Sequence, residues 1–125
     1  MIVGLGTDIV ERERIQASLS RLGEAFAKRI LTTSELAEFS ESKQQVALLA
    51  KRFAAKEAAV KALGLGIGNG VSFQHMNISH DKYGAPLLEF NGFAKEHCDL
   101  LGVNHVHLSI SDEQRYAMAT VILET

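Results

Sequence analysis

Two acidic residues are placed so that their carboxylates could bind a metal ion together. Asp8 follows two glycines in segment 4–8, and Glu57 lies in a helical segment between Lys56 and Lys61. An acid on a buried face is costly unless it is paired, hydrogen-bonded or bound to a metal. Two oxygen ligands from different elements suit Mg²⁺, which completes its shell with waters and substrate phosphates. We therefore predict Asp8 and Glu57 as magnesium ligands.

The same residues also have a plainer interpretation. Lys61 is the i+4 neighbour of Glu57, and such a helix pair stabilises by about 0.3–0.5 kcal/mol without any function. The charge distribution favours a ligand, however, because residues 46–61 hold four basic side chains against Glu57 alone, on a chain of net charge −2. A local basic patch on a mildly acidic chain indicates a discrete anion such as a pyrophosphate, and argues against generic nucleic-acid binding. No Cys/His cluster has the spacing of a zinc site.

The elements that position the two acids follow from hydrophobic periodicity. Alternation predicts a strand over residues 2–10. Gly4, Gly6 and Asp8 share one face of it, so the glycines should leave empty space beside the carboxylate. Helical spacing begins at about Glu11, with Gly23 as a candidate break.

A capping box at 32–35 opens a further short helix. A long helix is then predicted from about Gln44 to Leu63, with Glu57 near the middle of its apolar stripe and Gly64 as its C-terminal stop.

A glycine stands at every second position from Gly64 to Gly70. These glycines follow a helix rather than a strand, so they do not match a dinucleotide fingerprint. Either a mobile loop or a backbone that approaches a ligand closely explains them.

The remaining patterns predict strands over 71–79 and 86–91, a helix over 92–101, and a hairpin of 105–111 with 116–123. The fold class is thus α+β, with a small mixed or antiparallel sheet packed against helices, in one domain over 1–125.

Composition points to a cytoplasmic protein. Cys98 is the sole cysteine, which excludes an intrachain disulfide, and its apolar neighbours predict a core position. No run approaches the roughly 18 apolar residues of a membrane span. The N-terminus has no charged segment and reaches Asp8 too early for a signal peptide. We expect no contact with membranes or nucleic acid.

Two segments together resemble the signature segments of the 4′-phosphopantetheinyl transferases. They are Gly6-Thr7-Asp8-Ile9-Val10 and the stretch from Phe53 to Gly64, which contains Lys56-Glu57 and Lys61. The short length and the closing His107-Leu108-Ser109-Ile110-Ser111 are similar to the bacterial holo-acyl-carrier-protein synthase type. The resemblance covers essentially the whole chain.

This resemblance implies transfer of the 4′-phosphopantetheine arm of coenzyme A to a serine of an apo-acyl carrier protein, with release of adenosine 3′,5′-bisphosphate. Asp8 and Glu57 would bind Mg²⁺, and Lys61 would contact the phosphates beside Glu57. Further coenzyme A contacts are expected from Arg52, Lys56, Gly64 and Gly66. The family also implies a homotrimer with active sites at subunit interfaces.

The general base stays open, because Asp112 stands where many relatives have a histidine. The unperturbed pKa of an aspartate is near 3.9 rather than about 6.5, so Asp112 cannot simply replace an imidazole. His107, Glu57, and a magnesium-bound water deprotonated with the help of Glu57 are the alternatives, and we favour the last. His107 shares a strand face with His105, Ser109 and Ser111, which reads as a solvated surface unless it meets the site.

Carrier proteins are acidic, and the resemblance therefore implies a docking face on the first helical region at Arg14, Arg21 and Phe26. By pattern alone these residues also fit a solvated helix with an ordinary core stripe. Two other functions stay open, a small Mg-dependent nucleotide pyrophosphohydrolase and a non-catalytic nucleotide- or RNA-binding module. The first usually clusters several carboxylates on one helix, and the second needs exposed aromatics on a basic sheet face.

Overall fold

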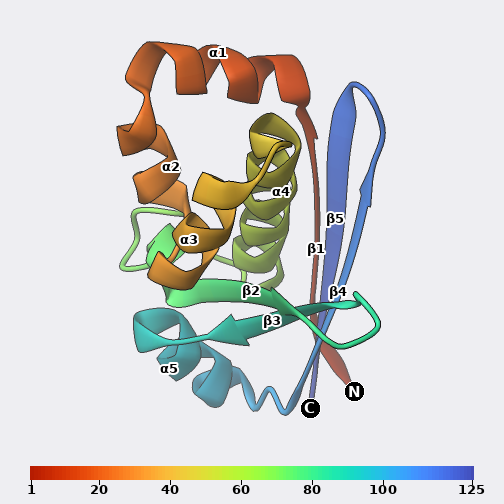
Figure 1. The fold of residues 1–125 in the computed structure, drawn as a ribbon. Helices are drawn as coiled ribbons and strands as arrows, with labels where there is room; N and C mark the ends of the chain where they lie inside the picture. The colour runs from red at the N-terminus through yellow and green to blue at the C-terminus, as the bar shows by residue number, and fades with distance from the viewer.

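A three-stranded antiparallel sheet and one long helix form the frame of the computed structural model, which describes residues 1–125. The strands β1 (Ile2–Glu11), β5 (Tyr116–Glu124) and β4 (His105–Asp112) lie in the order β1-β5-β4. The helix α4 (Gln45–Ala62) packs against one face of this sheet (Figure 1). The predicted hairpin of the C-terminal strands is confirmed.

The first strand approaches α4 so closely that two of its positions admit only glycine. A Cβ atom on Gly6 would lie 1.9 Å from the carbonyl oxygen of Ala58, and one on Gly4 would lie 2.2 Å from that of Ala62. The expectation that the glycines leave empty space beside Asp8 is therefore wrong. The backbone of α4 fills that space, and the contact brings Asp8, on the same face of β1, next to the helix.

The helix α4 is buried on nearly all sides. The sheet covers one side, while α1 (Arg12–Leu22), α2 (Glu24–Ile30) and α3 (Thr33–Glu41) cover another. The prediction of a single apolar stripe with Glu57 at its middle is wrong for this reason. Phe53 and Glu57 are partly exposed and Lys61 is exposed. These three residues follow one another at four-residue spacing along the open side of α4.

The N-terminal helices form as their local signals predict. Gly23, at φ 64°, separates α1 from α2. The capping box of α3 is present, because the Glu35 amide donates to the Thr32 hydroxyl and the Thr32 amide donates to the Glu35 carboxylate. Gly64, at φ 75°, follows the end of α4 as expected.

A second, two-stranded sheet lies at the lower end of α4 in Figure 1, beside β4 of the large sheet. It pairs β2 (Met76–His80) with β3 (Pro86–Phe90), and α5 (Gly92–Leu101) follows it. The predicted strand over 71–79 is wrong at its start, where residues 73–75 form a 3-10 turn, η1 (Phe73–His75). Ser72 causes this turn, because its hydroxyl accepts from the Gln74 amide while its own amide donates to Nδ1 of His75.

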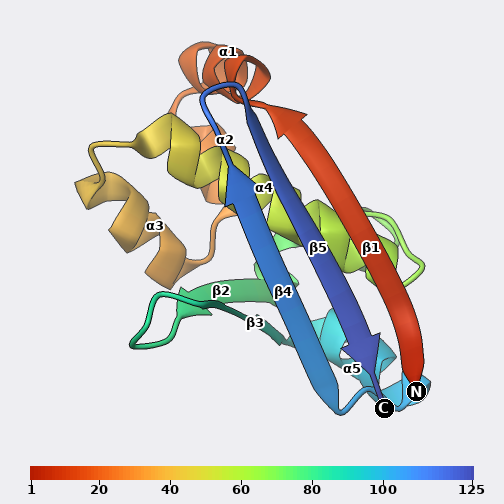
Figure 2. The ribbon, with the colours of Figure 1, turned by 90° about the vertical axis from the view of Figure 1, so that its right-hand side faces the viewer.

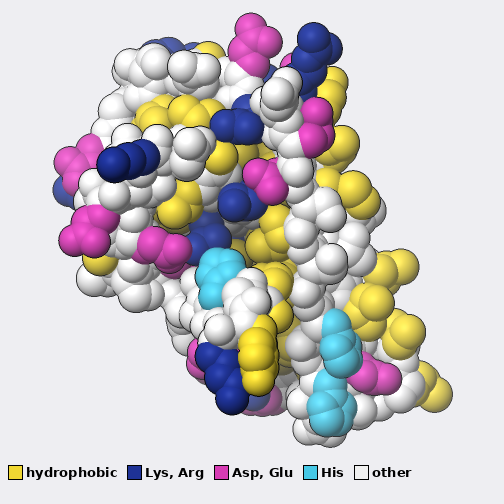
Figure 3. Space-filling view, turned by 45° about the vertical axis from the view of Figure 1, so that its right-hand side comes forward, with side chains coloured by type: hydrophobic (Ala, Val, Ile, Leu, Met, Phe, Trp, Pro, Cys, Tyr) yellow, Lys and Arg dark blue, Asp and Glu magenta, His cyan; other side chains and the backbone are white.

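The other face of the three-stranded sheet is uncovered, as the view onto the strands shows (Figure 2). It carries exposed apolar side chains, among them Leu5 at 66%, Ile9 at 63% and Met118 at 44% exposure. Hydrophobic side chains line this margin of the space-filling view (Figure 3). Cys98 is buried, as predicted. None of the helices has both the length and the apolar composition needed to cross a bilayer.

Candidate active site

One cleft brings the two predicted metal ligands together. It has a volume of about 360 Å³ and lies where β1, α1, α2 and α4 meet. Asp8 from β1 and Glu57 from α4 both line it. The remaining wall comes from α1 and its neighbours, namely Ile9, Val10, Arg14, Ile15, Ser18, Phe26 and Phe53.

Lys61 is tied to the cleft through its pairing with Asp8. Its ammonium donates to Oδ1 of Asp8 at 3.0 Å and to the carbonyl oxygen of Thr7 at 3.0 Å. The Asp8 side chain is 16% exposed and the Lys61 side chain 52% exposed, so the ammonium remains accessible from solvent. The plainer interpretation of a Glu57–Lys61 helix pair is not what the structure shows, because Lys61 reaches across to β1 instead.

Glu57 has no ion-pair partner of its own. Burial raises the pKa of its carboxyl above the ordinary value, the negative charge of Asp8 raises it further, and Lys61 partly offsets both effects. Two carboxylates that repel each other at the edge of a cleft form a site suited to a divalent cation. The chain has no group of three or more His, Cys, Asp or Glu side chains able to hold a metal. Two protein oxygens, with the other positions left to water and substrate phosphates, match the binding habits of Mg²⁺.

The structure does not bring Lys56 to this cleft. Its side chain is 0% exposed, and its ammonium donates to Oε1 of Glu35 at 2.6 Å and to the carbonyl oxygens of Ile30 and Phe73 at 2.7 and 3.2 Å. All three donor positions of an ammonium are therefore occupied within the protein. The expectation that Lys56 contacts coenzyme A is corrected to a structural role.

Arg52 also lies away from Asp8 and Glu57. It lines a separate cleft between α3 and the start of α4, and it donates to Oε2 of Glu38 at 2.9 Å. Its side chain is 2% exposed, and its Nε atom has no hydrogen-bond partner. Within one chain Arg52 therefore cannot touch a ligand held by Asp8 and Glu57.

The predicted histidine and the two predicted glycines lie in different parts of the fold. His107 lies on the uncovered outer face, where its Nε2 is 2.9 Å from Oε1 of Glu124, and Asp112 is exposed at the end of β4. Asp8 lies on the opposite face, so His107 does not reach the cleft of its own chain. Gly64 and Gly66 lie in the loop that follows α4, on the Lys61 side of the helix end.

Two of the three predicted docking residues line the cleft. Arg14 and Phe26 line the cleft, whereas Arg21 is exposed in the last turn of α1 and is not part of the cleft wall. Sequence reasoning missed Ser18, although its four-residue spacing from Arg14 places both on one side of α1. Phe53 lies between the core and the cleft, since it packs against the core and also lines the cleft.

Comparison with known proteins agrees with this geometry. The model of the 4′-phosphopantetheinyl transferase superfamily matches residues 4–121. A holo-[acyl-carrier-protein] synthase of Vibrio cholerae is 64% identical over 124 residues, which span 99% of this chain and 98% of that protein.

Solved structures show the same fold. The crystal structure of holo-[acyl-carrier-protein] synthase from Neisseria meningitidis matches with a TM-score of 0.94 at 45% identity, covering 100% of both chains. The Helicobacter pylori synthase, solved in complex with coenzyme A, matches with a TM-score of 0.84 at 33% identity, over 96% of this chain and 99% of that one.

The chain therefore belongs to the 4′-phosphopantetheinyl transferase superfamily. Within that superfamily it is of the bacterial holo-[acyl-carrier-protein] synthase type, and the resemblance inferred from its two signature segments is confirmed.

Proposed function

We propose that the cleft of Asp8 and Glu57 is where this transferase moves the 4′-phosphopantetheine arm from coenzyme A to a serine hydroxyl of an apo-acyl carrier protein. Adenosine 3′,5′-bisphosphate is the second product. The observation that carries the proposal is the meeting of two carboxylates in one cleft, with the accessible ammonium of Lys61 bonded to one of them. The Helicobacter pylori relative, solved with coenzyme A, supports the choice of donor.

Asp8 and Glu57 would hold a Mg²⁺ ion, which neutralises charge on the pyrophosphate and on the leaving nucleotide. Lys61 acts beside them as a phosphate contact. Its ammonium already lies 3.0 Å from Asp8 and stays half exposed, so it can turn one donor toward a phosphate oxygen. Catalysis of this kind depends mainly on positioning the phosphates and neutralising their charge. The two carboxylates, which would hold the cation, and the ammonium of Lys61 are placed for this.

The proton of the acceptor serine goes to Glu57 through a water molecule in this proposal. The position of Glu57 supports the choice, because its carboxylate lines the cleft beside that of Asp8 and lies within reach of a water held there. His107 is the weaker candidate, since it lies on the other face of the sheet and could act only in the cleft of a second copy.

The nucleotide half of coenzyme A extends along the end of α4 toward Gly64 and Gly66. Both glycines follow Lys61 within five residues of the chain, and Gly66 has no side chain that could block a ligand. Arg52 is the weakest of the proposed coenzyme A contacts, because its side chain is 2% exposed, pairs with Glu38 and belongs to a separate cleft.

The carrier protein docks on α1 and α2 at Arg14, Arg21 and Phe26. Arg14 and Phe26 line the reaction cleft itself, so a carrier bound there presents its serine to the metal site. We predict that Arg14→Glu raises the Michaelis constant for the carrier about tenfold through charge repulsion and leaves that for coenzyme A within about twofold. The control is Lys43→Glu, an exposed charge outside the cleft. Equal effects on both substrates would remove the docking assignment.

We further propose that the chain assembles as a homotrimer and acts in the cytoplasm. The uncovered apolar face of the three-stranded sheet supports assembly, because a contiguous exposed patch of that kind marks an interaction surface. The single buried cysteine suits a reducing compartment. Nucleic acid is not an expected partner, since the outer face presents histidines, serines and aliphatic residues rather than aromatics among basic groups.

The test is the intact mass of a purified apo-acyl carrier protein after incubation with this chain, coenzyme A and Mg²⁺. We expect a gain of one phosphopantetheine, which a chelator abolishes. Glu57→Gln and Asp8→Asn should each lose the transfer while the protein stays folded. Glu89→Gln, an exposed acid on β3, serves as the matched control. Hydrolysis of coenzyme A without any mass gain would instead favour the pyrophosphohydrolase.

A further inference from the structure

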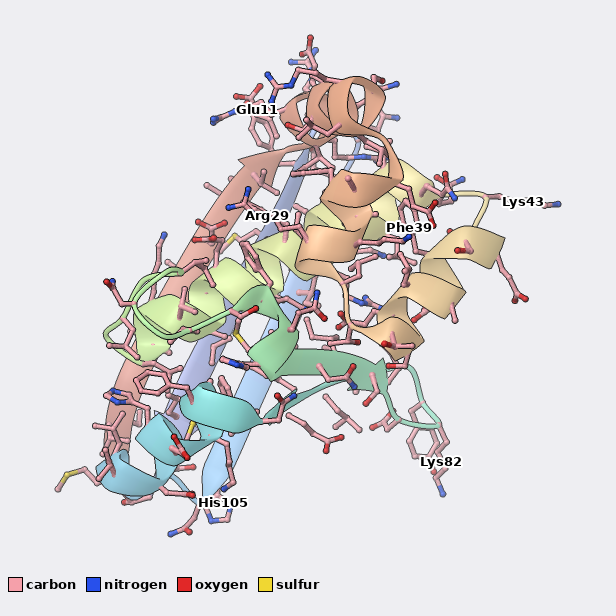
Figure 4. All side chains as sticks on the ribbon, turned by 90° about the vertical axis from the view of Figure 1, so that its left-hand side faces the viewer. Glu11, Arg29, Phe39, Lys43, Lys82 and His105 are labelled. Atoms are coloured by element: carbon pink, nitrogen blue, oxygen red, sulfur yellow. The ribbon has the colours of Figure 1, made fainter.

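Within the glycine loop 64–70 one backbone hydrogen bond, from the Asn69 amide to the Gly66 carbonyl oxygen, joins two residues of the loop. The other backbone bonds of the loop run to residues beside it, and Leu65 and Ile67 pack against the core. Gly64, Gly68 and Gly70 adopt positive φ values of 75°, 102° and 88°. Glycine backbone is the most freely rotating kind, and ordering it costs more entropy than ordering any other residue. A loop intended to receive a ligand therefore needs support from another element. Figure 4 shows this loop directly above α5.

The first support is His97 of α5, at the point where the loop begins. Its Nε2 lies 3.1 Å from the carbonyl oxygen of Leu63, the residue that ends α4. A carbonyl oxygen can only accept, so Nε2 carries the proton and donates it. The last carbonyls of a helix have no partner within the helix, and this bond satisfies one of them. His97 thus fixes the direction in which the chain leaves α4.

The second support is Phe93, one turn earlier on α5, at the point where the loop ends. A Cβ atom on Gly70 would lie only 3.2 Å from Cε1 of the Phe93 ring, so the ring rests directly on the Gly70 backbone. The Phe93 and His97 rings stack, with centroids 6.4 Å apart and planes inclined by 20°. The two rings therefore form one aromatic support that contacts the chain at both ends of the loop.

We propose that Phe93 and His97 are positioning residues for the nucleotide half of coenzyme A, and that they act by holding the glycine loop in its receptive shape. This rests on the proposed function, in which the loop receives the nucleotide. Neither ring needs to touch the ligand. By ordering the loop before binding, the aromatic support removes an entropic cost that binding would otherwise carry. The metal site and the carrier surface lie on other elements and are not affected.

The experiment compares Phe93→Ala and His97→Ala with Leu100→Ala, which removes an 84% exposed side chain from the same helix. Calorimetric titration with adenosine 3′,5′-bisphosphate measures the nucleotide affinity without requiring turnover. We expect each loop variant to bind it about tenfold more weakly, and to show a similar rise in the Michaelis constant for coenzyme A. The turnover number at saturating coenzyme A and the Michaelis constant for the carrier should stay within about twofold, and Phe93→Tyr should restore affinity.

Each outcome supports or overturns the positioning role of Phe93 and His97. Unchanged nucleotide affinity in folded Phe93→Ala and His97→Ala, or a loss of turnover at saturating coenzyme A instead, overturns the positioning role while the transferase function stands. Weaker nucleotide binding in both variants supports the positioning role even if the wild-type chain were to fail in carrier modification. Absence of nucleotide binding by the wild-type chain would overturn the positioning role as well.

Discussion

Glu57 shows how a requirement of the proposed site, at the scale of one residue, works against stability. Its carboxylate is partly buried beside that of Asp8, and Lys61 is bonded to Asp8 rather than to Glu57. Without a cation the charged form of Glu57 is disfavoured in the folded chain. Sites prepared for a ligand often carry such a cost, which ligand binding then offsets.

The direction of this pKa shift gives a testable pH dependence. The folded-state pKa of Glu57 is raised above the ordinary value of 4.5, so the folded protein holds this proton more tightly than the unfolded chain does. The penalty is therefore fully present above the folded pKa and disappears as the pH falls below the unfolded one. We predict that Glu57→Gln, in chelator at about pH 8, raises the thermal midpoint by a few degrees, and that the gain vanishes near about pH 4.

Differential scanning calorimetry across this pH range measures the effect, and added Mg²⁺ should remove the difference by stabilising the wild-type chain. Glu124→Gln is the matched control, because the hydrogen bond from His107 lowers the pKa of Glu124 and the sign of its contribution is opposite. A lower midpoint for Glu57→Gln at pH 8 in chelator would show that the carboxylate is stabilised and not strained.

At the scale of elements, periodicity predicts what depends on neighbours in the chain and misses what depends on distant backbone. The helices, the C-terminal hairpin and the capping box of α3 rest on local spacing, and their prediction was correct to within a few residues. The partners of Lys56 are 17 to 26 residues away along the chain, so no local pattern could show that its ammonium is buried.

The candidate site follows the same division. Asp8, Glu57 and Lys61 could be found because their types and spacing are unusual for a core, whereas the partner of Lys61 depends on how closely β1 approaches α4. That approach depends on the absence of side chains at Gly4 and Gly6, and sequence reasoning interpreted the absence as open space. Ser18 became part of the cleft only through the packing of α1 over α4.

The contact of β1 with α4 leads to a prediction for Gly6→Ala. The new methyl group would collide with backbone, at 1.9 Å from the Ala58 oxygen and 2.6 Å from the Ala62 nitrogen, and backbone cannot rotate away as a side chain can. We expect a loss of about 3 kcal/mol or more in the free energy of unfolding, measured with chemical denaturant. In Gly66→Ala the added atom finds its nearest neighbour 3.8 Å away, so this control should unfold like the wild type. Equal stability of the two variants would contradict the close packing.

The buried pair of Lys56 and Glu35 ties the segments around α4 together. Glu35 accepts from the Lys56 ammonium, from the Thr32 amide and, through Oε2, from the Ile78 amide. Breaking a buried pair by removing one partner typically costs about 3–5 kcal/mol, because it leaves the other charge uncompensated. We predict such a loss for Lys56→Met in chemical denaturation, and less than about 1 kcal/mol for the half-exposed Lys61→Met. If Lys56→Met lost little free energy of unfolding but showed a large rise in the Michaelis constant for coenzyme A, Lys56 would be a binding residue and not a structural one.

At the scale of the whole molecule, the single chain leaves two features unexplained. One is the apolar outer face of the sheet, and the other is the position of His107 and Arg52 away from the cleft of their own chain. The proposed assembly of copies through the outer face accounts for the apolar face and for His107, because it covers the apolar residues and allows one copy to supply His107 to the cleft of another. The strand β5 lies at the middle of the sheet, so Met118, between Ile9 and Ser111, lies on the central strand of that face.

We therefore predict that Met118→Glu separates the assembly into single chains of 13.6 kDa. The new carboxylate would be buried without a partner, at a cost of several kcal/mol for each copy. Light scattering after size exclusion measures the mass, which should be three times larger for the wild type. Transfer activity should fall together with the mass, while far-UV circular dichroism stays unchanged. Leu100→Glu adds the same charge at an exposed apolar site on α5 and should preserve both mass and activity. If Met118→Glu were monomeric and still fully active, each cleft would be complete within its own chain, and His107 and Arg52 would have no place in the reaction.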